Sequence, residues 1–225
     1  MTDISSATAR KPRGEYAKTA ETRQAILDAA LEVFASGYNG GSLRDIAERV
    51  GMSEAGLLHH FKNKSALLQA VLDHRDDLAR AIVDFDAADP VDGLRGLAKL
   101  AAYNASIPGV VELFCTLSAE ATSPAHPAHD YFINRYAYVR RSIGDCARRI
   151  DASGGLKQGV DPDRFAVTTI ALMDGLQVQW LLDPTSTDMA EALAEHFRTF
   201  VRGYDLTAIE QALDARLPPA VEAAE

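Results

Sequence analysis

Apolar residues recur along most of the chain at the three- and four-residue spacing of amphipathic helices. The first such run consists of Ile26, Leu27, Ala30, Leu31 and Phe34, and Gly37 follows it. No segment shows the strict alternation of apolar and polar residues that is typical of a half-buried strand. The pattern therefore predicts an all-α chain of about nine helices.

Capping and turn residues mark where these helices begin and end. Ser42 with Asp45 is a capping-box-like start, and Gly51 ends that helix. Ser53 caps a second short helix, and Asn63 begins a longer one that runs to about residue 84. The remaining helices are expected to start at Asp89-Pro90, Pro108, about residue 128, Asp161-Pro162 and about residue 187.

Composition divides the chain into four parts. Residues 1–18 are small and polar, with Arg10, Lys11 and Arg13 clustered, and this predicts a flexible basic arm. Residues 19–64 form a small domain of short helices, and residues 65–205 form a larger helical domain. Residues 206–225 are a tail rich in Ala, Glu and Pro.

The two short helices over residues 42–61 are joined by Val50-Gly51-Met52, a turn of a few residues that contains glycine. This is the arrangement of a helix-turn-helix, in which the second helix presents its N-terminal half to the major groove. Small residues at that end, among them Ala55 and Gly56, allow close approach to DNA. Spacing alone fits equally a helical hairpin that serves only for packing.

The net charge of −9, from 23 basic and 32 acidic residues, at first argues against a nucleic-acid partner. The charge is unevenly divided, however. Residues 1–64 carry 9 basic and 8 acidic residues, whereas residues 65–225 carry 14 and 24. A near-neutral head on an acidic body is compatible with DNA binding, because the body would repel DNA and help to orient the head.

The run from Thr22 to Leu68 closely resembles the N-terminal domain of TetR-family transcriptional regulators. The matching residues are Arg23, Ile26, Ala30, Phe34, Gly37, Tyr38, Ile46, Ala47, Gly51, Ser53, Phe61, Lys64, Leu67 and Leu68. The C-terminal region matches the family only in the number and length of its helices. The resemblance implies a ligand-responsive regulator, most often a repressor, that binds a palindromic DNA operator as a homodimer and is released by a small-molecule effector.

The resemblance also implies which residues contact DNA: Ser42, Arg44, Ser53, Glu54, Ala55, Gly56, Leu57, His59, His60 and Lys64. The sequence departs from the family at two of the positions that often carry hydroxyl groups. Leu58 stands where tyrosine is common, and Gly56 stands where threonine is common. Two hydroxyl–phosphate contacts are therefore expected to be missing. The basic arm could enter a neighbouring minor groove or could remain a solvated tail.

The larger domain is expected to supply a cavity for the effector. Aromatic and soft apolar residues with a few polar groups are typical of such a cavity, although each of them fits an ordinary core equally well. The candidates are Tyr103, Phe114, Leu117, Phe132, Tyr136, Met173 and Gln177. Ligand binding is expected to act through the long helix over residues 64–84, which joins the two domains.

In the resembling family the last two long helices pair with their copies in a four-helix dimer interface. Here these helices would span about residues 162–182 and 187–202. The candidate interface residues are Phe165, Leu172, Leu176, Gln179, Trp180, Leu193, Phe197 and Phe200. Two recognition helices about 34 Å apart would then meet successive major grooves.

Other classes of protein find little support. The chain has no apolar run near the ~20 residues of a membrane span, its N-terminus lacks the apolar core of a signal peptide, and it has two cysteines. A cytoplasmic protein without cofactor or membrane partner is therefore expected. His59-His60 point about 100° apart on a helix, and His126 and His129 lack ligand partners nearby, so no metal site is predicted. No catalytic motif is present; an all-α enzyme or a scaffolding bundle remains the alternative.

Overall fold

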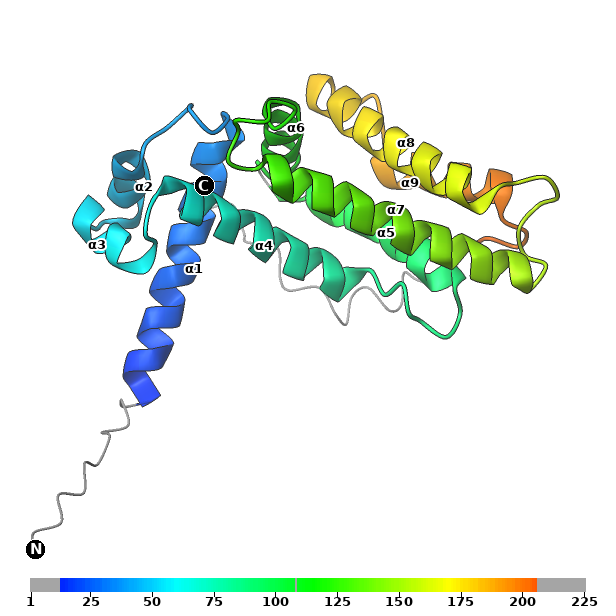
Figure 1. The fold of residues 1–225 in the computed structure, drawn as a ribbon, viewed down its shortest axis with the longest axis horizontal. Coiled ribbons are helices and arrows are strands. Elements are labelled where there is room, and N and C mark those ends of the chain that lie inside the picture. The colour runs from blue at the N-terminus through cyan, green and yellow to red at the C-terminus, as the bar shows by residue number, and fades with distance from the viewer. Residues whose placement is uncertain (1–12, 108, 206–225) are drawn as a thin grey trace, which may run out of the picture.

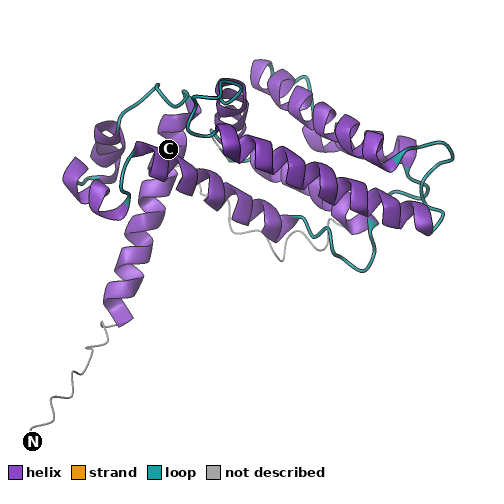
Figure 2. Cartoon of the chain, in the orientation of Figure 1, coloured by secondary structure: helices purple, strands orange, loops and turns teal. Residues whose placement is uncertain are grey.

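The computed structural model describes residues 13–107 and 109–205 (Figure 1). The helices are α1 (Arg13–Ala35), α2 (Leu43–Val50), α3 (Glu54–His60), α4 (Lys64–Ile82), α5 (Val91–Ala105), α6 (Val110–Glu120), α7 (His129–Ala152), α8 (Pro162–Leu182) and α9 (Met189–Phe200). Figure 2 shows that the described residues form helices and loops with no strand; a single bridge joins Leu156 and Val201. The all-α prediction is confirmed.

Most helix ends lie where the capping residues predicted them. The side chains of Ser42, Ser53, Asn63 and Asp161 each accept a hydrogen bond from the first turn of the helix that follows. Gly51 ends α2 with φ of 74°, a left-handed conformation that glycine adopts without steric penalty.

Three boundaries differ from the predictions. Helix α1 begins at Arg13, within the residues predicted as a flexible arm; Arg10, Lys11 and the predicted tail lie outside the described residues. Helix α5 begins one residue later than predicted, because Asp89 accepts a hydrogen bond from the backbone of Val91 and leaves Pro90 before the helix. Helix α6 begins at Val110 rather than at residue 108.

Helices α1–α3 form a small unit at one end of the molecule, and α5–α9 form an elongated body (Figure 1). Helix α4 leaves the small unit and runs along the body. In the body, α7 packs against α8, α5 packs against α9, and α6 packs against α1 of the small unit. The two parts are thus joined by α4 along the chain and by α6 through packing.

The apolar core of the small unit extends into the larger part of the chain. It contains Phe34, Ile46 and Leu67 together with Leu113 and Leu117 of α6, all fully buried. A second core fills the body between α5, α7, α8 and α9. Helix α6 therefore shares a core with the small unit, across the predicted domain boundary at residue 64.

Candidate DNA-binding surface and effector cavity

The start of α2 is held by a reciprocal pair of hydrogen bonds. Ser42 Oγ accepts from the backbone N–H of Asp45, and Asp45 Oδ2 accepts from Ser42 N at 2.7 Å and from Ser42 Oγ at 2.8 Å. The Ser42 backbone and hydroxyl bonds lower the pKa of Asp45. The Ser42 hydroxyl is exposed but already hydrogen-bonded, so a contact to DNA phosphate would compete with the cap.

Arg44 extends from the first turn of α2 into solvent, with 77% of its side chain exposed. Its Nε donates to Glu48 at 2.8 Å, and this carboxylate raises the Arg44 pKa. An exposed ion pair contributes little free energy. The guanidinium can therefore exchange Glu48 for a phosphate oxygen at little cost.

Helix α3 presents its N-terminal residues to solvent. Ser53, Glu54, Ala55 and His59 are exposed, and Gly56 and His60 are partly buried. A Cβ at Gly56 would meet Ser53 Oγ at 3.4 Å, an ordinary contact, so packing within the described chain does not require glycine there.

The prediction that Leu57 faces DNA is wrong. Leu57 is fully buried in the core of the small unit, together with Phe61, one helical turn further on. Leu58 takes the outward position, with 41% of its surface exposed. The family's usual tyrosine position is thus occupied on the outer face by an apolar side chain.

Lys64 lies where the loop before α2 meets the start of α4. Its Nζ donates to the backbone carbonyl of Gly41 and lies 4.6 Å from the ring centroid of Tyr38. Partial burial lowers the pKa of Lys64. The ammonium therefore joins the loop between α1 and α2 to the start of α4, in addition to any contact it makes with DNA.

Two further residues border this surface and were not among the predicted DNA contacts. The Arg23 guanidinium lies 4.3 Å above the ring centroid of Phe61 and is exposed. Tyr38 Oη lies 2.9 Å from Ser65 Oγ at the start of α4. Both positions depend on contacts between helices, so no local sequence signal could have placed them on this face.

A carboxylate of α6 holds the loop that follows α1. Glu120 Oε2 accepts from the backbone N–H of Tyr38 at 2.8 Å and lies 3.3 Å from His126 Nε2. Gly37 has φ of 95°, and a Cβ there would lie 2.4 Å from Glu120 Oε1. The positive φ therefore favours glycine at the point where the body touches the small unit.

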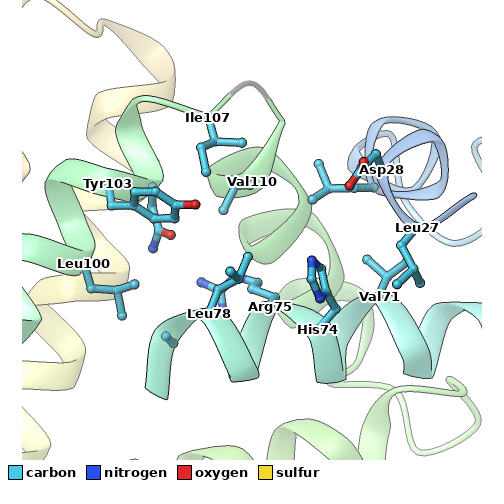
Figure 3. A pocket seen from close by; sticks show the side chains of 13 residues that line it. Leu27, Asp28, Val71, His74, Arg75, Leu78, Leu100, Tyr103, Ile107 and Val110 are labelled. Carbon is cyan, nitrogen blue, oxygen red and sulfur yellow. The ribbon is translucent and has the colours of Figure 1, made fainter. Parts of the chain in front are cut away.

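Two cavities meet at Arg75 of α4. Figure 3 shows the first one, between α1, α4, α5 and the start of α6, with Leu27, Val71, Leu78 and Tyr103 among its lining residues. The second lies inside the body. It is lined by Arg75, Leu100, Asn104, Phe114, Arg135, Tyr136, Val139, Ile170, Met173, Asp174 and Gln177. Its volume is about 50 Å³, room for a few water molecules.

The cavity residues agree only in part with the predicted ligand set. Phe114, Tyr136, Met173 and Gln177 line the body cavity, and Tyr103 lines its neighbour. Leu117 and Phe132 of the predicted set lie elsewhere. Both are buried in the core shared by α6, the start of α7 and the small unit, and they line neither cavity.

The predicted dimer residues were chosen by apolar character, and half of them are wrong because they are buried within the protomer. Phe165, Leu176, Leu193 and Phe197 fill the body core. Leu172, Trp180 and Phe200 are partly buried and Gln179 is exposed. The outer face of α8 instead carries the exposed side chains of Val167, Ala171, Val178 and Leu182. Gly175, which is partly buried, lies on the same face.

Helix α8 is long and apolar enough to cross a membrane by length and composition, but it packs against α7 and α9 and its inner face belongs to the body core. Among residues 13–107 and 109–205, no three His, Cys, Asp or Glu side chains come together as metal ligands would.

Comparison with known proteins relates both parts of the chain to transcriptional regulators. The family model for bacterial regulatory proteins of the tetR family matches residues 26–71, and the model for the C-terminal domain of BetI-type transcriptional repressors matches residues 110–204. The regulator TtgR of Pseudomonas putida is 30% identical over 181 residues, which cover 75% of this chain and 84% of TtgR.

Solved structures show the same relationship. A TetR-family regulator from Rhodococcus sp. is 30% identical, with a TM-score of 0.67, and the match covers 80% of this chain and 98% of that one. A regulator from Saccharomonospora viridis, solved in complex with choline, is 25% identical with a TM-score of 0.67, covering 81% and 99%.

Proposed function

The chain belongs to the TetR family of bacterial transcriptional regulators, and on this basis we propose that it is a cytoplasmic repressor that binds its operator as a homodimer and leaves it when a small molecule enters the body. The observation that carries the proposal is the exposed N-terminal half of α3, held between a glycine turn and the capped start of α4.

We assign the reading of base edges to the start of α3, namely the exposed Ser53, Glu54 and Ala55 and the partly buried Gly56. Arg44, His59, His60 and Lys64 form the rim that contacts phosphates, and Arg23 extends this rim along α1. Leu58 contributes an apolar surface to the same face, suited to a thymine methyl group or a sugar rather than to a phosphate.

We propose that two copies pair through the outer face of α8. Val167, Ala171, Gly175 and Val178 recur at helical spacing, so they form one stripe of small and branched apolar side chains. No described side chain lies within 4 Å of a Cβ built at Gly175, which leaves room for a second helix to approach closely. Pairing here also accounts for a helix that is apolar on both its inner and its outer face.

Two routes connect the body cavity to the DNA-binding surface. Helix α4 carries Arg75 at the cavity and Lys64 at its start, eleven residues or roughly 16 Å away along the helix. Helix α6 contributes Phe114 to the cavity lining, and at its end Glu120 accepts a hydrogen bond from the backbone of Tyr38 in the loop after α1. A ligand that separates α4 from α6 would therefore shift both supports of the small unit.

The choline of the S. viridis regulator raises the question of a cationic effector here. Aromatic side chains with a carboxylate are typical of sites for quaternary ammonium groups. In this chain the body cavity has Phe114, Tyr136 and Asp174, but it also has two arginines. Choline is therefore one candidate effector and not the one that the charges favour.

Footprinting on the DNA upstream of the gene for this chain tests the proposal. Protection should cover two half-sites about one helical turn apart and should weaken steeply as the salt concentration rises. The change Ala55→Glu at the proposed base-reading surface should abolish protection, whereas the control Glu112→Ala, exposed on α6, should not. Protection that survives Ala55→Glu would refute the assignment of α3.

A further inference from the structure

Arg75 is a buried cation that pairs with no carboxylate among the described residues. Its side chain is 8% exposed, and its Nε and Nη1 have no hydrogen-bond partner among the described residues. Its main contact is the ring of Phe114, whose centroid lies 4.3 Å from Cζ. Buried guanidinium groups are normally paired, because removing a charge from water without a partner is unfavourable.

The charged groups around Arg75 do not neutralise it. Arg135 is paired with Asp76, and both of these side chains are largely buried. Asp174 accepts a hydrogen bond from Tyr136 Oη at 2.8 Å across the body cavity. Burial and the like charge of Arg135 lower the Arg75 pKa to about 10, which still leaves the guanidinium charged at neutral pH.

Three neutral polar groups also lie near Arg75. Tyr131 Oη is buried without a hydrogen-bond partner in the described chain, and burial raises its pKa. Cys115 also has a pKa raised by burial. Gln177 donates to the carbonyl of Met173, and its own buried Oε1 has no hydrogen-bond partner within residues 13–107 and 109–205. The site thus offers unused donors at Arg75 beside apolar walls.

We propose that the effector of this regulator is a small aromatic or otherwise apolar carboxylate, whose oxygens accept hydrogen bonds from Arg75 Nε and Nη1. This inference rests on the proposed function, since it names the ligand class for the same cavity. The apolar part of the ligand packs against Phe114, Val139, Ile170 and Met173. The carboxylate lies on the Arg75 side, away from Asp174, which would repel it.

The position of Arg75 connects this ligand to DNA release. Arg75 belongs to α4 and lines both cavities, so it lies at the junction between body and small unit. The body cavity is too small for an aromatic ring, and helices must separate to admit one. A carboxylate that holds Arg75 therefore stabilises a displaced α4, and the small unit moves with it.

The test uses full-length protein and matched probes. Benzoate, 1-naphthoate and 3-phenylpropionate are compared with their primary amides, and benzyltrimethylammonium serves as the cationic probe. Calorimetry measures binding, and a gel shift on the footprinted operator measures release. We expect each carboxylate that binds to do so at least about tenfold more tightly than its amide, as charge-assisted hydrogen bonds imply.

Variants at position 75 test whether Arg75 is the cause of the preference for carboxylates over amides. Arg75→Met removes the charge while keeping the length of the chain, and it should fold, since removing an unpaired buried charge relieves an unfavourable term. It should lose the preference for carboxylates. Arg75→Lys should keep part of it. Arg148→Met, on the exposed side of α7, is the matched control and should bind as the parent does.

Each outcome bears on the inference. Equal affinity for carboxylate and amide, a preference for the cationic probe, an unchanged preference in Arg75→Met, or no binding of any probe would overturn it. The proposed function fails separately: it is refuted if the parent protein does not protect its operator. Operator release by an amide or by the cationic probe would support the proposed regulator function and would refute only the proposal that the effector is a carboxylate.

Discussion

Replacing Lys64 by methionine should lower the stability of the folded small unit as well as its affinity for DNA. In the folded chain the ammonium donates to the carbonyl of Gly41 and lies 4.6 Å from the ring centroid of Tyr38. Lys62, two residues earlier, is exposed and makes no such contact among the described residues. Lys62→Met removes a lysine charge two residues away and is the matched control.

The magnitude follows from these two interactions. A hydrogen bond from a charged donor contributes about 1.5–3 kcal/mol, and partial exposure of Lys64 places it at the lower end. A cation–π interaction at such a site adds about 0.5–1 kcal/mol. Lys64→Met should therefore lower the free energy of unfolding by about 2 kcal/mol, or the melting temperature by roughly 4–8 °C in a chain of this size.

Thermal unfolding and operator binding at several salt concentrations separate the two effects. Lys64→Met should reduce the slope of log affinity against log salt by about one unit, because the protein then neutralises one phosphate fewer. Only Lys64→Met should lower the melting temperature. If the two variants melt together, Lys64 does not hold the loop at Gly41 and the structural reasoning is refuted.

Three further changes have defined outcomes. Leu57→Ala should lower the free energy of unfolding by about 3 kcal/mol, because the side chain is fully buried. Leu58→Ala should change the free energy of unfolding little and should weaken operator binding. Chemical denaturation measures the stability and gel shifts measure the binding; equal stability of the two variants would contradict the burial argument. Burial raises the pKa of Asp174, so its ionised form opposes folding, and Asp174→Asn should be more stable than the parent at neutral pH. The stability difference between Asp174→Asn and the parent should shrink as the pH falls towards the range in which the parent carboxyl is protonated. A stability difference that grows on acidification would contradict a raised pKa of Asp174. Val178→Glu should dissociate the dimer in sedimentation experiments while Ile133→Glu, equally exposed on α7, should not; a dimer that tolerates both changes pairs through another face.

The local features of the small unit could be predicted because each depends on residues within one helical turn. The capping box of Ser42 and Asp45 and the left-handed turn at Gly51 are decided by side-chain chemistry and by backbone sterics at those positions. Leu57 and Leu58 show the limit of this reasoning. Both are leucines in a helix of seven residues, and only the position of Phe61 and α2 decides which one is buried.

The larger part could be predicted only as a set of helices. Phe165 and Phe197 have the apolar character expected of interface residues, but they fill the body core. The smaller Ala171 and Val178 lie on the exposed face of α8. An apolar helix that is buried on one side within the protomer and exposed on the other has no sequence period that marks the two faces.

The sequence by itself determined the all-α fold, the helix-turn-helix and its caps, because these follow from periodicity and from interactions between near neighbours in the chain. Tertiary structure alone decided that α6 shares its core with the small unit and that Glu120 reaches the loop at Tyr38. It also decided that Arg75 is buried beside Phe114 with no counter-ion in the described part of the chain. Such relations join residues far apart in sequence, and burial and charge pairing arise only when helices pack.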